Sequence, residues 1–82
     1  MKIVWDTPKY LANLDKHEMD FADLTIEFFE AAIVYPSRAG RFVAVGWIGN
    51  QIVAAVVFKP LGTEALSVIS MRPASRKQRN LL

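Results

Sequence analysis

Three arginines in the last part of the sequence are the residues whose type and spacing best suit chemistry. Arg76 and Arg79 are three residues apart, so they share one face of a helix, and Arg72 precedes Pro73 at the expected end of a strand. Each guanidinium has a permanent charge and forked donors that match the oxygens of a phosphate. The three side chains therefore predict a phosphate-binding site, to which Lys77 adds charge. A solvated basic tail is the alternative interpretation.

Chemistry at a phosphate also needs groups that move protons. Arginine keeps its proton near neutral pH, whereas the ordinary pKa of histidine suits proton transfer, and His17 is the single histidine. A histidine that closes a helix also interacts favourably with the helix dipole, which is the structural alternative for His17. Glu64 is the one acid in residues 31–82. It is a candidate base, or the partner of Lys59 in an ion pair across a turn.

Further candidates lie on the faces of expected strands. Alternate residues share one face of a strand, which groups four positions in the middle of the chain: Arg41, Val43, Val45 and Trp47. Trp47 could stack on a base of single-stranded RNA, or it could pack in the core. Ser70 and Arg72 share a face of the last strand, and Arg41 could join them. With Lys59, these side chains predict a cationic sheet surface.

The charge is divided unevenly along the chain, although the net charge is only +2. Residues 1–30 hold three lysines against seven acidic residues, a net charge of −4. Residues 31–82 hold seven basic residues against Glu64 alone, a net charge of +6. A cationic face of that strength attracts a polyanion or an acidic protein partner.

Composition excludes several classes of protein. The chain lacks cysteine and has one histidine, so we expect no metal site, and no cofactor motif is present. The longest apolar run, Ile52 to Phe58, is too short to span a bilayer, and the N-terminus lacks the pattern of a signal peptide. We therefore expect a cytoplasmic protein. At 82 residues and 52% hydrophobic composition, residues 1–82 are expected to form one domain.

Residues that cap or start helices predict the elements of the first half of the chain. Lys2 to Trp5 reads as an edge strand, and Asp6-Thr7-Pro8 signals a helix that stops near His17. Asp20 is expected to cap a second helix, whose buried face carries Phe21, Leu24 and Phe28.

Four strands and a short helix are expected in the second half. The strands cover residues 32–35, 41–48 and 51–59, with a last strand that ends at Arg72-Pro73. Gly49-Asn50 predicts a two-residue hairpin turn, and Pro60 to Gly62 predicts another turn. Ser75 and Gln78 form a capping-box pattern at the start of the helix. The fold class is α+β, with an antiparallel meander, two N-terminal helices and a short basic C-terminal helix.

The chain resembles the BrnT family along nearly its whole length. The residues that carry the resemblance are Trp5-Asp6, Lys9, Asn13, Lys16-His17 and Phe21-Ala22 at the start, Arg41 and Gly46 in the middle, and Ile69-Ser70, Arg72, Ala74-Ser75 and Arg79 at the end. BrnT proteins are toxins of bacterial type II toxin–antitoxin pairs. The resemblance implies a RelE-like fold, ribonuclease activity that inhibits translation, and neutralisation by a BrnA antitoxin.

This sequence departs from the family pattern at three places. Glu18 stands where the family usually has glycine, Gln78 replaces a common glutamate, and Asn80-Leu81-Leu82 replaces a more polar ending. The leading prediction is a metal-independent ribonuclease toxin, with Arg72, His17 and Glu64 as catalytic candidates. The predicted RNA-binding residues are Arg41, Trp47, Lys59, Arg76, Lys77 and Arg79. The alternative is a non-catalytic module that binds nucleic acid or an antitoxin through the same face.

Overall fold

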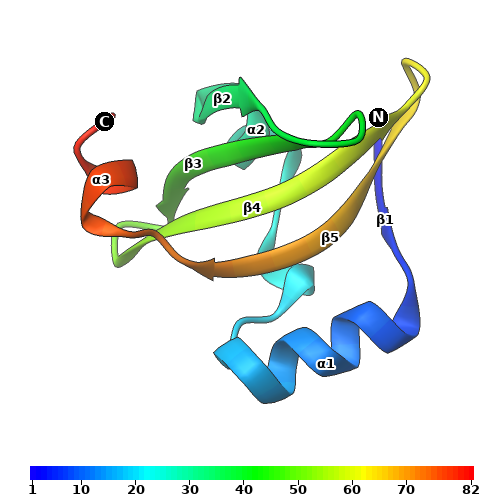
Figure 1. Ribbon diagram of the computed structural model, residues 1–82, viewed down its shortest axis with the longest axis horizontal. Coiled ribbons are helices and arrows are strands. Elements are labelled where there is room, and N and C mark those ends of the chain that lie inside the picture. Colours follow the sequence, from blue (N-terminus) through cyan, green and yellow to red (C-terminus); the bar gives the residue numbers. More distant parts are fainter.

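The computed structural model describes residues 1–82 and contains one five-stranded sheet with helices on both of its faces (Figure 1). The sheet order is β1-β5-β4-β3-β2. The elements in chain order are β1 (Lys2–Trp5), α1 (Thr7–His17), the 3₁₀ helix η1 (Phe21–Asp23), α2 (Ile26–Ala31), β2 (Ile33–Pro36), β3 (Phe42–Ile48), β4 (Ile52–Leu61), β5 (Ala65–Pro73) and α3 (Arg76–Arg79).

The α+β class and the meander are confirmed. Strands β2 to β5 pair in sequence order and antiparallel, while β1 is an edge strand, as predicted, that pairs in parallel with β5. Strand β4 lies in the centre of the sheet, and residues 53–56 of it are buried. No helix is long and apolar enough to cross a membrane.

One face of the sheet is covered by the N-terminal helical segments and holds the larger core. Its fully buried members include Phe21, Val56, Val68 and Met71. Gly46 lies on this face, because a Cβ atom there would lie 3.1 Å from a Phe28 ring carbon and 3.3 Å from the Ala32 Cβ. A larger residue would therefore push α2 away from the sheet. The opposite face, here called the open face, has a smaller cluster formed by Val43, Val45, Val53 and Ala55, with Tyr35, Val57 and Ala74 packed against it.

The prediction of one continuous second helix was wrong. The chain forms the 3₁₀ helix η1 and then the separate helix α2. Each segment has its own N-cap: Asp20 accepts from the Ala22 N–H at 2.8 Å and caps η1, and Thr25 accepts from the Phe28 N–H at 3.1 Å and caps α2. Because Thr25 is extended in order to cap α2, the helix cannot run through it.

Several strand boundaries also differ from the predictions by one or two residues. Arg41 precedes β3, and β4 continues through Pro60 to Leu61. Pro60 is tolerated because the pairing of β3 with β4 ends at Phe42 and Phe58, so Pro60 has a neighbouring strand on one side only. Gly49 has the predicted positive φ of 59°, but the first paired residues are Ile48 and Ile52, so the loop has three residues.

Helix α1 ends at Glu18 in a conformation that favours glycine. Glu18 is left-handed, with φ 56° and ψ 26°, and its N–H donates to the Leu14 carbonyl. A side chain with a Cβ atom costs about 1–2 kcal/mol in this region. Glu18→Gly should therefore stabilise the fold by about 1 kcal/mol, which raises the Tm by about 4–8 °C in a domain of this size.

Thermal unfolding of the purified variant measures this shift. The matched control is Asp15→Gly, at an exposed position inside the same helix, where glycine should destabilise by about 1 kcal/mol. A lower Tm for both variants would show that the Glu18 side chain makes a contact that outweighs its backbone strain.

A β-bulge in β5 decides which side chains reach the open face. Val57 is opposite Ser70 while Phe58 is opposite Val68, so Ile69 is the extra residue. Before the bulge Leu66 and Val68 face the larger core, and after it Met71 does. The one-residue shift exchanges the two faces of the strand.

Candidate nucleic-acid interface

Arg72 lies on the open face because of the bulge. It is opposite Ala55, which belongs to the open-face cluster, whereas an uninterrupted strand would place residue 72 on the same face as Val68. The side chain is partly exposed, and its Nη1 donates to the Pro73 carbonyl at 3.2 Å. The remaining guanidinium donors are free for a ligand.

Helix α3 is closed by its own capping box and is held over the open face by two hydrogen bonds to the sheet. The predicted capping box is present: the Ser75 hydroxyl accepts from the Gln78 N–H at 3.2 Å, and the Gln78 Oε1 accepts from the Ser75 N–H at 2.9 Å. The Gln78 Nε2 also donates to the Tyr35 hydroxyl at 3.0 Å, and the Ala74 N–H donates to the Val53 carbonyl at 2.8 Å. The glutamine thus caps the helix and ties it to β2.

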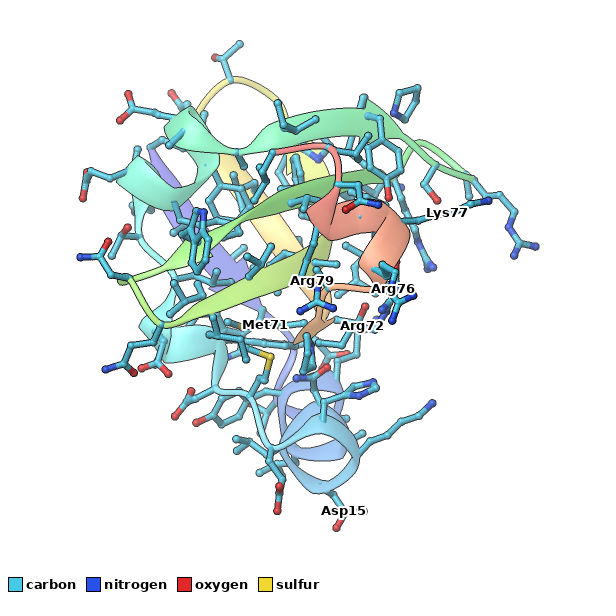
Figure 2. The ribbon with its side chains drawn as sticks, turned by 90° about the vertical axis from the view of Figure 1, so that its left-hand side faces the viewer. Asp15, Met71, Arg72, Arg76, Lys77 and Arg79 are labelled. Atoms are coloured by element: carbon cyan, nitrogen blue, oxygen red, sulfur yellow. The ribbon has the colours of Figure 1, made fainter.

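The three predicted arginines come together at this end of the sheet. In the view of Figure 2, Arg72, Arg76 and Arg79 group where α3 meets the end of β5. No ion pair involves any of them, because the single ion pair in the structure joins Lys9 to Asp6. Lys77 lies apart from them, next to Tyr35, Ser75 and Leu81 on another side of α3. The structure therefore separates Lys77 from the arginine cluster, which we define as Arg72, Arg76 and Arg79.

Trp47 is on the open face, as the alternation in β3 predicts. It is 55% exposed, so it does not form part of the buried core. Trp47 and Arg79 line the same hollow, of about 250 Å³, together with Val53, Pro73 and Ala74. An exposed aromatic ring beside a guanidinium can stack on a base while the charge contacts the adjoining phosphate.

Arg41 and Lys59 lie on the same face but at its other end. Arg41 precedes Phe42 and Lys59 follows Phe58, the last pair between β3 and β4, and a Cβ atom at the adjoining Gly40 would lie 3.9 Å from the Lys59 Cε. Lys59 is four positions along β4 from Ala55, the residue opposite Arg72. Along an extended strand this is a distance of about 13 Å. The open face therefore carries two basic groups, and Arg41 does not join the arginine cluster directly.

Glu64 lies far from the arginine cluster. It belongs to the turn that joins β4 to β5, while Arg72 is near the other end of β5, about 26 Å away along an extended strand. The predicted ion pair between Glu64 and Lys59 does not form. Glu64 contributes its backbone carbonyl, which accepts from the Lys2 N–H at 2.8 Å. Glu64 and Arg72 therefore cannot act on the same phosphate.

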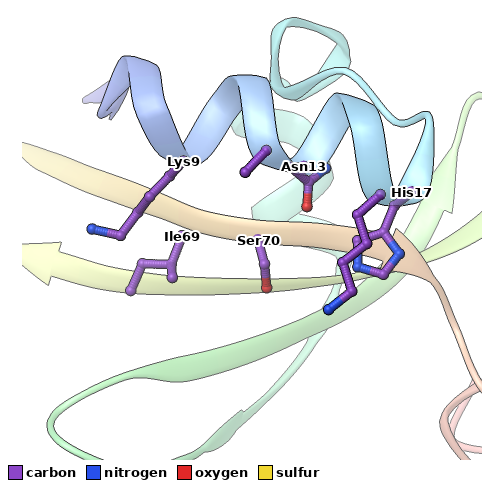
Figure 3. Close-up of a pocket in the computed structure, with 7 residues that line it drawn as sticks. Lys9, Asn13, His17, Ile69 and Ser70 are labelled. Carbon is purple, nitrogen blue, oxygen red and sulfur yellow. The ribbon is translucent and has the colours of Figure 1, made fainter.

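His17 lines a cleft of about 210 Å³ between α1 and β5. Figure 3 shows its imidazole beside the C-terminal end of β5, the strand that carries Arg72. Lys9, Ala12, Asn13, Lys16, Ile69 and Ser70 line the rest of the cleft. His17 is thus close to the end of the sheet where the arginines gather, which keeps it as a candidate for proton transfer.

Asn13 fixes the position of α1 against β5. It is 5% exposed; its Nδ2 donates to the Met19 carbonyl at 3.0 Å, and its Oδ1 accepts from the Met71 N–H at 2.9 Å. Strand β1 stops pairing at Val68, so without Asn13 the Met71 N–H would have no partner on that edge. Asn13 is part of the BrnT resemblance, but the sequence did not reveal this role. An asparagine among the apolar positions of a helix was the available signal.

Acidic side chains lie elsewhere in the molecule. Asp15 on α1 points away from the arginine cluster (Figure 2). Asp20 raises the pKa of the Tyr10 phenol, through a hydrogen bond and its negative charge, and Asp23 adds to the effect. No three side chains of His, Cys, Asp or Glu gather where they could hold a metal ion.

Two comparisons with known proteins gave matches. The family model described as the ribonuclease toxin BrnT of type II toxin–antitoxin systems matches residues 5–78. The chain is also similar to the crystal structure, at 1.1 Å resolution, of the Brucella abortus ribonuclease toxin BrnT. The two are 56% identical, the match covers 93% of this chain and 99% of that one, and the TM-score is 0.88. A comparison with curated proteins gave no match.

Proposed function

Because the chain belongs to the BrnT family of ribonuclease toxins of type II toxin–antitoxin systems, we propose that it cleaves RNA at the arginine cluster, with Arg72 as the main phosphate contact. The observation that supports this site most strongly is the bulge, which turns Arg72 onto the open face beside Arg76 and Arg79. Three guanidinium groups without acidic partners suit the charge of a phosphate and of a phosphorane.

The proposed reaction uses the RNA's own nucleophile. The 2′-hydroxyl attacks the adjacent phosphorus and loses its proton, and the bond from phosphorus to the 5′ oxygen breaks as that oxygen gains a proton. The products are a 2′,3′-cyclic phosphate and a 5′-hydroxyl. Arginines cannot move these protons, whereas His17, beside the end of β5, can exchange one with the substrate. Glu64 has no part in this proposal because it lies at the other end of β5.

Single-stranded RNA fits the open face better than a duplex. Trp47 and Arg79 share a hollow, and a splayed base can stack on an exposed ring only if it is unpaired. Arg41 and Lys59 extend the positive charge along the same face. The protein would act where RNA is abundant, in the cytoplasm.

Salt dependence of RNA binding tests the proposed face. Each phosphate contact on a single strand contributes about −0.7 to the slope of log affinity against log salt. Arg76→Ala with Arg79→Ala should flatten this slope by about one to two units, measured by fluorescence anisotropy with a 2′-O-methyl oligonucleotide that cannot be cleaved.

The matched control is Lys2→Ala with Arg38→Ala, which removes the same charge outside the arginine cluster. If both double variants change the slope equally, binding depends on net charge, and if neither changes it, α3 is not the RNA site.

An antitoxin is the expected partner of a toxin in this family, and a BrnA-like protein would neutralise this chain by covering the same face. Complementary charge speeds encounter and fixes orientation, so the segment that docks on the arginine cluster should be acidic. Antitoxin should then displace the bound 2′-O-methyl oligonucleotide in a competition assay. A stable complex of toxin, antitoxin and oligonucleotide together would place neutralisation on another face.

A further inference from the structure

The cleft between α1 and β5 has a charge pattern that the arginine cluster does not account for. Lys9, Lys16 and His17 line it from the helix, and the Ser70 side chain lines it from the strand. None of its lining residues is acidic. Lys9 lies 3.5 Å from Asp6, but both side chains are about half exposed, and such pairs contribute little. A cleft lined by these donors is suited to an anion.

Helical spacing spreads the positive charge along the cleft. Lys9 and Lys16 are seven residues apart, which places them on one face of α1 about 10.5 Å apart along its axis. Figure 3 shows Lys9 near one end of the cleft and His17 near the other, with Ser70 between them. Ala12 lines the same stretch with a small side chain, which leaves room for a ligand. The cationic groups therefore form a row, which suits consecutive phosphates better than one small anion.

The buried polar side chain that lines the cleft already has its hydrogen-bond partners. Both polar atoms of the Asn13 side chain are engaged, one with the Met19 carbonyl and one with the Met71 N–H. No buried side-chain nitrogen or oxygen lacks a hydrogen-bond partner. The donors left for a ligand are the outer side chains of Lys9, Lys16, His17 and Ser70. The bulge at Ile69 places Ser70 in the cleft and on the same strand face as Arg72.

We infer that the α1–β5 cleft binds the backbone of single-stranded RNA next to the arginine cluster, with Lys9, Lys16 and Ser70 holding phosphates beyond the one held by Arg72. This inference rests on the proposed function and deepens it. The substrate must then be long enough to reach both groups, and the preference for length comes from α1. An acidic protein segment would need the same donors, and the experiment distinguishes it from RNA.

Length-dependent binding is the test. Lys9→Ala with Lys16→Ala should weaken binding of a 2′-O-methyl dodecanucleotide by roughly tenfold at low salt and flatten its salt slope by about 1.4 units. Binding of a dinucleotide, which fills only the arginine cluster, should stay unchanged. Circular dichroism and the Tm should remain those of the wild type, because both lysines are exposed. Lys2→Ala with Arg38→Ala is again the charge-matched control.

Several outcomes would overturn this inference. If the lysine double variant loses the same affinity for both probes, or loses no affinity for the longer one, RNA does not bind in the cleft. Loss of antitoxin affinity with unchanged RNA affinity would assign the cleft to a protein partner. Arg72→Ala distinguishes the two proposals, because it should weaken both probes. Suppose that Arg72→Ala leaves the binding of both probes unchanged, while the lysine double variant weakens binding of the dodecanucleotide. The cleft then binds RNA, and the proposed centre at Arg72 is wrong.

Discussion

Replacing Arg72 with alanine should abolish growth inhibition when the protein is expressed in bacteria. If Arg72 stabilises the charge that develops on the phosphorane, its loss should lower the rate of RNA cleavage by about 10²–10³-fold. The side chain is partly exposed and makes one local hydrogen bond, so the free energy of unfolding should change by about 0.5 kcal/mol or less. Growth after induction, cleavage of purified RNA and thermal unfolding are the three measurements.

Two companion variants sharpen this result. Arg72→Lys keeps the charge but loses the forked donors, so it should retain only part of the activity. Arg38→Ala removes an arginine from the turn between β2 and β3 and should stay toxic. Wild-type toxicity of Arg72→Ala would exclude Arg72 from catalysis. Loss of folding together with toxicity would give the side chain a structural role.

Replacing Asn13 with alanine should cause the largest loss of stability. The change leaves the N–H of the fully buried Met71 and the Met19 carbonyl without their partners. An unsatisfied buried group costs about 1–3 kcal/mol, so the total should be about 3 kcal/mol. That is a large part of the stability of a small domain, and it should lower the Tm by about 15 °C.

A control variant on α1 and hydrogen exchange at the Met71 amide test this prediction. Asp15→Ala changes an exposed residue of the same helix and should alter the free energy of unfolding by about 0.5 kcal/mol or less. Hydrogen exchange at the Met71 amide should be slow in the wild type and fast in Asn13→Ala. A Tm within a few degrees of wild type, with Met71 still protected, would show that water replaces the asparagine.

Local sequence determined most of the elements because their signals act over a few residues. Pro8 lies in the first turn of α1, after Asp6 at the N-cap position, and the Ser75 and Gln78 capping box starts α3 as predicted. Alternation placed Trp47 on one face of β3, and that face is the open one. The break between η1 and α2 was also a local matter, because Thr25 is an N-cap residue that the prediction of one helix ignored.

The separation of Glu64 from Arg72 could have been expected from the sequence. The predicted strand already placed Glu64 at its start and Arg72 at its end, and an extended strand separates its ends by about 3.3 Å per residue. Two residues at opposite ends of one strand cannot share a phosphate.

The sequence by itself therefore determined the α+β class, the basic helix and the positions of the arginines along the chain. Only the tertiary structure decided which face Arg72 occupies, because the bulge at Ile69 is a matter of register between β5 and β4. A shift of one residue in pairing exchanges the faces of a strand. The role of Asn13 has the same origin. Its partner at residue 71 is 58 positions away, and the need for it arises where β1 stops pairing with β5.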